Sequence, residues 1–425
     1  MFLLKAAPVV LLPVLLFVPA ADQDEAGAKT PEPDKGAVAQ AEKVQKDEDI
    51  ERLIRELGSD HFKAREGAKQ KLLKLGAGAL SALKKASASS DLEAARRAQL
   101  LYEQIQRSLR EEAVKQGVAK AMAEGVDLFV ERLAAKGKPL TDLEWAIAAG
   151  IFQEVIQKAE KLGFSKQQYF DYSRLPIMSP PGPEHPGKGT CCNLRFVGSH
   201  DWSKLSMMAD SMILTPGPIQ HNKMFSTCFA ITNGGFKVSG VGEASVVICD
   251  GKVEAKSSAS IVVANGPIEG SNSASLLVSN STITSPHVVD SILVAGGDVT
   301  VEGDLARSKI ISRGKARFQE FKDRRIKNVV KENQEEIPEL VKFFQPAQLG
   351  LVLSNSLGVV QVKKDSVFAR AGFHEGDVVA EIDGQKVMSY DEFRTLLRRK
   401  VVQGGANFAL RRHAETLILN VPFKQ

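Results

Sequence analysis

The sequence predicts a multidomain α+β protein: a helical N-terminal region, a central β-helix of short coils and a small mixed C-terminal domain. Three observations lead to this prediction. Apolar triplets repeat at nearly constant spacing over residues 212–318. Apolar residues at helical spacing fill residues 48–162, and a hairpin turn followed by a helix-capping sequence lies beyond residue 380. The 425 residues suffice for about two to four domains.

The repeat consists of seven apolar triplets, from Met212 to Lys309, whose starts are separated by 17, 17, 15, 15, 16 and 17 residues. Small residues and then Asn, Asp or Gly follow most triplets, which is typical of strands that end in tight turns. One coil cannot bury its apolar face alone, whereas stacked coils can, so the period predicts a β-helix. The spacing and the turn residues resemble bactofilin-like β-helices. A β-sandwich of hairpins is the alternative fold.

Polar residues recur at one turn of the repeat: Asn233, Asp250, Asn265 and Asn280. A row of carboxylates or metal ligands there would indicate polysaccharide cleavage, but only one of the four residues is acidic. We therefore expect a structural ladder, in which side-chain amides bond the backbone at a tight corner.

Residues 1–21 are predicted to be a signal peptide. Lys5 precedes an apolar run from Ala6 to Pro19, and small residues lie before a cleavage point near Ala21 or Asp22. The run is too short for a stable transmembrane anchor. Residues 22–47, rich in Ala, Pro, Lys, Glu and Asp, are predicted to be a disordered linker. We expect the protein to be exported: periplasmic, secreted or on the cell surface.

Residues 48–170 are predicted to form amphipathic helices. The string from Leu57 to Glu66, followed by Leu72-Leu73-Lys74-Leu75-Gly76, resembles HEAT-type helical repeats. That resemblance implies a surface for protein–protein contact. A helical hairpin domain that only packs is the alternative.

Residues 171–211 form a predicted connector that contains residue types able to bind zinc, among them His185, Cys191, Cys192 and His200. No CxxC or HxxxH spacing is present, so a disulfide or free thiols are the favoured interpretation. We expect no metal and no cofactor. The pairing of the four cysteines (Cys191, Cys192, Cys228 and Cys249) cannot be read from the sequence.

Residues 319–342 belong to a highly charged pattern, starting at about Lys315, that predicts a helix capping the open end of the stack. Nine basic and two acidic residues lie between Arg307 and Lys327. Such a patch suits nucleic acid, but export argues against that partner, and the net charge of +5 is small for this length. An anionic cell-envelope surface remains the alternative partner.

Residues 343–425 resemble a PDZ domain of the bacterial HtrA-type. The resemblance rests on the string from Asp365 to Val387, with its Ala-Gly, Gly-Asp and Asp-Gly pairs. Asp383-Gly384 predicts a type I′ hairpin turn. Ser389 and Glu392 predict a capping box at the start of the following helix.

The resemblance implies that a peptide adds as an extra strand beside that helix and that backbone N–H groups hold its terminal carboxylate. Leu349-Gly350-Leu351 matches the family's loop, so the amides of Gly350 and Leu351 are assigned to the carboxylate, and Gly350 is expected to keep the approach open. An apolar C-terminal ligand residue is expected in the side-chain pocket, which consists of Leu349, Leu351, Leu353, Phe393, Leu396 and Leu397. The alternative is that the groove serves internal packing, for instance on the stack.

No Gly-x-Ser-x-Gly or similar nucleophile motif is present, and the seven His residues lack plausible triad partners, so no catalytic residue is predicted. The sequence favours an exported, non-enzymatic scaffold or adaptor that binds protein C-termini. The alternative is an envelope hydrolase, metal-dependent or not, that uses the PDZ domain to recognise its substrate.

Overall fold

The computed structural model describes residues 47–164, 189–192, 194–242, 244–318, 330–333, 336–413 and 415–423. The chain divides into two compact units, Met1–Gln106 and Arg107–Gln425. The predicted signal peptide and residues 22–46 of the predicted linker lie outside the described residues. No helix within the described ranges is long and apolar enough to cross a membrane.

The first unit is helical. It contains a helix over residues 47–57, α2 (Phe62–Leu75), η1 (Gly76–Ala79), α3 (Leu80–Ala86) and the first part of α4 (Leu92–Glu124). Its core is formed by apolar residues at helical spacing, including Leu53, Leu72, Leu83 and Leu101. Gly76, with φ +55°, ends α2 in a conformation that disfavours side chains.

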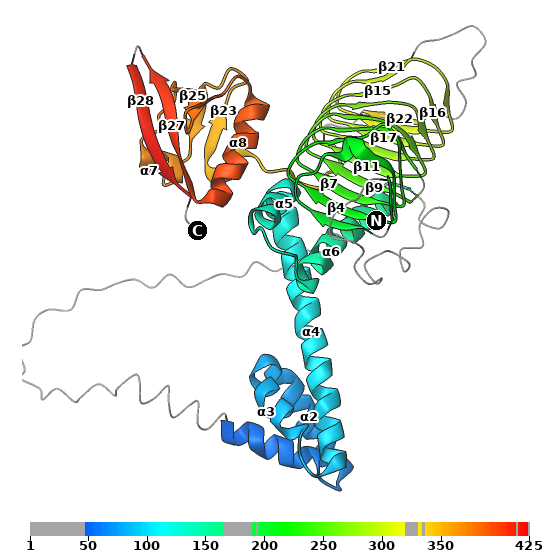
Figure 1. The fold of residues 1–425 in the computed structure, drawn as a ribbon, viewed down its shortest axis with the longest axis vertical. Helices are drawn as coiled ribbons and strands as arrows, with labels where there is room; N and C mark the ends of the chain where they lie inside the picture. The colour runs from blue at the N-terminus through cyan, green and yellow to red at the C-terminus, as the bar shows by residue number, and fades with distance from the viewer. Residues whose placement is uncertain are drawn as a thin grey trace, which may run out of the picture. The chain divides into compact units, whose positions relative to one another are not determined.

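The second unit contains the predicted β-helix, drawn in green to yellow in Figure 1. Its two sheets are parallel, and the seven apolar triplets are seven of the nine strands of one sheet. The nine strands are β2 (Arg195–Val197), β4 (Met212–Thr215), β7 (Phe229–Thr232), β9 (Val246–Cys249), β11 (Ile261–Ala264), β14 (Leu276–Ser279), β17 (Ile292–Ala295), β20 (Lys309–Ser312) and β22 (Val330–Asn333). We call this sheet the triplet sheet.

The other sheet follows the order β1 (Gly189–Cys192), β3 (Leu205–Ala209), β6 (Met224–Ser226), β8 (Phe236–Val241), β10 (Val253–Ser258), β12 (Ile268–Glu269), β15 (Ile283–Ser285), β18 (Val299–Val301) and β21 (Ala316–Phe318). Short strands pair beside this path: β5 (Ile219–Gln220), β13 (Asn272–Ser273), β16 (Val288–Val289) and β19 (Leu305–Ala306).

The register of the triplet sheet is the one that the repeat predicts. Met212 pairs with Phe229, Val246 with Ile261, and Ile292 with Lys309. A sandwich of antiparallel hairpins would pair the strands in the opposite direction, so the β-helix prediction is confirmed and the sandwich alternative is wrong.

The stack extends beyond residues 212–318 at both ends, where the sequence analysis expected a connector and a charged helix. β2 lies in the predicted connector and pairs with β4. At the other end the described residues Val330–Asn333 are not helical but form β22, which pairs with β20. Arg195, Lys331 and Glu332 interrupt the apolar pattern in these strands, because a terminal coil is held by hydrogen bonds to one neighbour and has less apolar surface to bury.

The triplet sheet is buried on both faces. Alternate residues such as Val247 and Val262 point into the β-helix, and the residues between them, such as Phe229 and Val246, pack against α5 (Val126–Ala135) and α6 (Asp142–Lys161). The rings of Phe152 on α6 and Phe229 stack with centroids 4.6 Å apart. Burial on both faces explains why the strands are continuous apolar triplets rather than alternating sequences.

Two side-chain ladders run along the stack. The first is at the predicted turn, but two of its amides bond side chains and not, as predicted, the backbone: Asn265 Nδ2 donates to Asp250 Oδ1 at 3.1 Å, and Asn280 Nδ2 donates to Asn265 Oδ1 at 3.0 Å. The sequence analysis missed the second, which is made by the serines that precede the triplets: Ser211, Ser245, Ser260, Ser275, Ser291 and Ser308. Ser275 N–H, for example, donates to Ser291 Oγ at 3.2 Å. Both ladders are structural, since they satisfy polar groups at the corners.

The C-terminal domain contains two antiparallel sheets and two α-helices, orange to red in Figure 1. Its elements are η5 (Pro346–Leu349), β23 (Leu351–Leu353), β24 (Val359–Val362), α7 (Val367–Ala371), β25 (Val378–Ile382), β26 (Gln385–Lys386), α8 (Tyr390–Gln403), β27 (Gly405–Arg412) and β28 (Glu415–Pro422). Asp383 and Gly384 both have positive φ, as a type I′ turn requires. Ser389 Oγ caps α8 at Glu392 N–H, but Glu392 Oε2 accepts from Met388 N–H, so only half of the predicted capping box forms.

Asp377, of the Gly-Asp pair, anchors this domain internally. Its two carboxylate oxygens accept from Arg412 Nε and Nη2 at 2.7 and 2.9 Å, and Oδ2 also accepts from His374 N–H at 2.8 Å. Burial alone would raise the pKa of Asp377, but Arg412 and the His374 N–H outweigh it and lower that pKa.

We expect Asp377→Asn to destabilise the C-terminal domain by about 2 kcal/mol at pH 7, because a charge-assisted pair is lost. A depressed folded-state pKa stabilises the native protein above the unfolded pKa of about 4 and loses that contribution as pH falls through the folded value. Thermal unfolding of both proteins between pH 7 and pH 2.5 measures this. The difference in melting temperature between the wild type and Asp377→Asn should become smaller below about pH 4. A difference that stays constant would contradict a lowered pKa of Asp377.

Candidate peptide-binding site

The outer edge of β23 offers backbone groups to a ligand. Among the described residues, β23 pairs with β24 alone. Lys363 N–H donates to Gly350 O at 2.8 Å, which makes the opposed residues Leu351 and Val362 a non-hydrogen-bonded pair. The N–H and C=O of Leu351 therefore point away from β24, toward the edge at which an added strand would bind.

Gly350 has a structural role that the sequence analysis did not foresee. Its N–H donates to Ala347 O at 3.0 Å and closes η5. Its φ is +84°, and a Cβ added there would lie 2.7 Å from Ser366 Cβ and 2.9 Å from Lys363 Cβ. The glycine is thus required by its own fold. Of the two amides assigned to a ligand carboxylate, Leu351 N–H points outward, whereas Gly350 N–H is already bonded.

The predicted pocket residues belong to one apolar cluster. Leu351, Leu396, Leu397 and Phe393 are buried, and Leu349 and Leu353 are partly buried against them. The cluster is the core of the whole C-terminal domain, and its other members include Leu128 of α5 and Phe344, which precedes η5. Residues that are far apart in the sequence therefore pack in the same apolar cluster as the six predicted pocket residues.

The neighbouring face of α8 carries Tyr390, Arg394 and Arg398 at intervals of four residues. Tyr390 Oη donates to Gln345 Oε1 at 3.2 Å, and Arg394 Nη1 donates to Phe344 O at 3.4 Å. Residues spaced by four lie on one face of a helix, so this whole face of α8 contacts the protein's own chain.

A buried group of charges lies on that face, formed by Asp127, Glu131, Asp250, Arg394 and Arg398, which we call the ion cluster. Arg398 Nη1 lies 2.8 Å from Asp127 Oδ2, and Arg398 Nε lies 3.4 Å from Glu131 Oε1. Arg394 Nη1 lies 2.6 Å from Asp250 Oδ1, and Arg398 also pairs with Asp250. The cluster joins α8 to α5 and to the coil of the β-helix that carries Asp250.

Backbone groups complete the ion cluster. Asp127 Oδ1 accepts from Phe344 N–H at 2.7 Å, Asn233 Nδ2 donates to Asp127 O at 2.8 Å, and Arg398 Nη2 donates to Asn233 O at 3.3 Å. The side chains of Arg398 and Asp127 are both 0% exposed. Burial lowers the pKa of Arg398, but Asp127 and Asp250 outweigh it and raise that pKa, so the guanidinium stays charged. Burial and the Asp127 carboxylate raise the pKa of Asp250 against the opposing effect of the arginines.

The structure shows the surroundings of three of the candidate Cys and His residues: Cys228, Cys249 and His200. Cys228 and Cys249 are buried, and burial raises the pKa of the Cys249 thiol, which makes it a poor nucleophile. His200 packs edge-on against Trp202 with ring centroids 5.1 Å apart. His185 lies outside the described residues. Within the described ranges, no group of three His, Cys, Asp or Glu residues could hold a metal ion.

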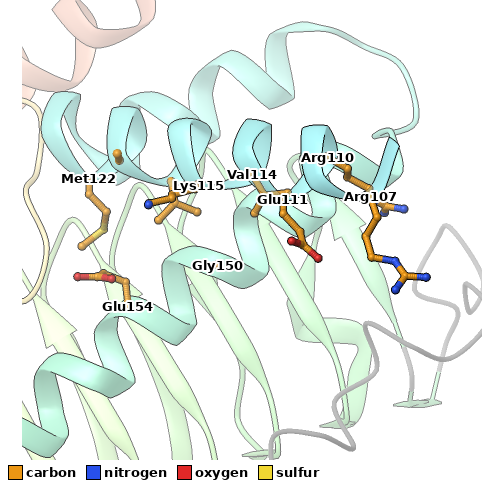
Figure 2. A pocket seen from close by; sticks show the side chains of 10 residues that line it. Arg107, Arg110, Glu111, Val114, Lys115, Met122, Gly150 and Glu154 are labelled. Carbon is orange, nitrogen blue, oxygen red and sulfur yellow. The ribbon is translucent and has the colours of Figure 1, made fainter. Parts of the chain in front are cut away.

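A separate hollow of about 700 Å³ lies between α4 and α6. Figure 2 shows Val114 and Met122 of α4 in it, with Arg107, Arg110 and Glu154 among its charged lining. No residue of the predicted site lines it.

Comparison with known proteins identifies one part of the chain. Residues 331–423 match the family model of the PDZ domain. No curated protein and no solved structure matches the chain. The C-terminal domain is thus a PDZ domain, as the sequence analysis predicted, and it follows a β-helix. The HtrA-type assignment and the HEAT-like repeats remain predictions.

Proposed function

We propose that this protein is an exported, non-enzymatic scaffold or adaptor that binds the C-termini of other proteins through its PDZ domain. The observation that carries the proposal is the outer edge of β23, where the N–H and C=O of Leu351 point away from β24. An extended peptide can add there as a strand, with main-chain hydrogen bonds for affinity and side-chain pockets for specificity.

The apolar cluster supports a preference for an apolar last residue. Leu349 and Leu353 are partly buried against the apolar cluster, so a ligand side chain placed beside them would remove apolar surface from water. No basic side chain is needed to hold the terminal carboxylate when backbone N–H groups do so. Leu351 N–H is the group we assign to this role.

Export is part of the proposal and is supported by the apolar run from Ala6 to Pro19 behind Lys5. The helical N-terminal unit supports a second protein contact, since helical repeats of the HEAT type serve that purpose. On this proposal, the PDZ domain captures a C-terminus while the helical unit binds another protein of the cell envelope.

A C-terminal peptide array probed with the full-length protein tests this function. Peptides that end in Val, Leu or Phe with a free carboxylate should bind. Amidation of the same peptides should weaken binding about tenfold or more, because the backbone N–H groups then lose their charged acceptor. Binding that is indifferent to amidation would overturn the proposal, as would the absence of any bound peptide.

A variant pair locates the site. Leu353→Glu places a charge in the partly buried end of the pocket and should weaken binding about tenfold. Val360→Glu, on β24 and 56% exposed, is the matched control and should bind as the wild type does. Equal melting temperatures establish that both variants are folded. Gly350 is unsuitable for such a test, because any side chain there collides with Ser366.

A further inference from the structure

The arginines of α8 are buried against partners that lie outside the PDZ domain. Asp127 and Glu131 belong to α5, and Asp250 belongs to the β-helix. A buried guanidinium without a partner is strongly destabilising. Arg394 and Arg398 would therefore either face water or meet other carboxylates whenever the PDZ domain is detached.

Asp250 is the residue of the β-helix that pairs with the arginines of α8. The positions equivalent to Asp250 in adjacent coils are Asn233 and Asn265, so the ladder itself needs only an amide. The one acidic member is the one that pairs with Arg394 and Arg398. Asp127 and Glu131 lie one helical turn apart on α5 and present their carboxylates to the same arginine.

The same contacts cover the helix side of the peptide site. Leu128, next to Asp127, belongs to the apolar cluster of the predicted pocket, and Arg394 holds the carbonyl of Phe344, another member of that cluster. Tyr390 and Arg394, which lie on α8 beside Phe393, are likewise bonded to Gln345 and to the carbonyl of Phe344, so the segment before η5 is held against this side of α8.

We infer that α5 and the β-helix act as an internal ligand that holds the PDZ groove closed, and that the true ligand carries acidic side chains upstream of its apolar C-terminus, which take over Arg394 and Arg398 from Asp127 and Asp250. The inference rests on the proposed function and adds to it the ligand class and its control. Binding is then an exchange of one set of carboxylates for another, so that neither state leaves the arginines unpaired.

Three variants of the full-length protein test the inference. Asp250→Asn removes the charge and keeps the ladder amide found in neighbouring coils. Arg394→Gln removes one of the arginines. Glu269→Gln, which removes an exposed carboxylate paired with Lys252 elsewhere on the β-helix, is the matched control. The probes are two labelled eight-residue peptides that end in Val, with Glu or with Gln at the three preceding positions, and fluorescence anisotropy measures their affinity.

The wild type and Glu269→Gln should bind the Glu peptide about tenfold more tightly than the Gln peptide. Asp250→Asn should bind both peptides several-fold more tightly and keep the Glu preference, because the internal ligand is weakened while the arginines remain. Arg394→Gln should also bind the Gln peptide more tightly, but its Glu preference should be reduced, because only Arg398 remains to pair with the ligand. Peptide binding with equal affinities across all four proteins would overturn the inference and leave the proposed function standing.

Hydrogen exchange of the α8 amides distinguishes a failure of the proposed peptide binding from a failure of the proposed closure. Exchange should be faster in Asp250→Asn than in Glu269→Gln, because α8 is released more often. Faster exchange without any peptide binding would refute the proposed function and, with it, the ligand class, while retaining the closure. Unchanged exchange would refute the closure itself.

Discussion

Arg398→Ala is expected to lower the free energy of unfolding by about 3–5 kcal/mol, one of the two largest effects we predict. The reason is that the carboxylates of Asp127, Glu131 and Asp250 stay buried while their central counter-ion is gone. Differential scanning calorimetry of the full-length protein measures the loss. The transition that is displaced should be the one that includes the contact between α8 and α5.

Arg399→Ala is the control for this experiment. Arg399 is the next residue of α8, its side chain is 47% exposed, and its Nε lies 3.7 Å from Glu131 Oε1. Because the Arg399 end of this long contact is exposed to water and Glu131 keeps Arg398 as its partner, the loss of Arg399 should cost about 1 kcal/mol or less. Asp127→Asn combined with Arg398→Ala should be less destabilising than the sum of the two single changes, because the second change removes a charge that the first left unpaired. Additive effects would show that the two residues do not act as a pair.

The β-helix was predictable because its signal is local. Each triplet specifies one strand, and the spacing between Met212 and Phe229 already fixes the register of the pair. The terminal strands were not predictable, since Arg195 and Lys331 interrupt the apolar pattern and these strands are defined by pairing with a neighbouring coil. Burial of the triplet sheet on both faces was implicit in its unbroken apolar runs, but nothing local indicates which helices cover it.

In the peptide site, too, the local features were predictable from the sequence and the long-range contacts were not. The turn at Asp383-Gly384 and the cap at Ser389 follow from short sequence patterns and are present. The ion cluster spans separations of 271 residues between Asp127 and Arg398 and 148 between Asp250 and Arg398. No sequence period connects such positions. The single acidic residue in the asparagine ladder was visible in the sequence, but it has a meaning only once α8 lies against it.

The other large effect is expected at Gly270, in the turn after β12. Its φ is +142°, a region that side chains rarely adopt, and a Cβ added there would lie 2.6 Å from the carbonyl carbon of Ala255 and closer still to its oxygen. Ala255 belongs to β10, the neighbouring coil, so the clash can be relieved only if β10 and β12 separate. Gly270→Ala should therefore destabilise the β-helix by about 4 kcal/mol or more.

Gly235→Ala is the matched control, because its added Cβ meets nothing nearer than Lys252 O, at an ordinary contact distance of 3.5 Å. Limited proteolysis should cleave Gly270→Ala first around β10 and β12, since the clash disrupts the pairing between these two strands. Asp250 lies in the turn between β9 and β10, so loss of this coil should also release α8 and raise its hydrogen exchange. A melting temperature within 2 °C of the wild type, which corresponds to about 1 kcal/mol, would show instead that the two coils are not packed as closely as the expected clash requires.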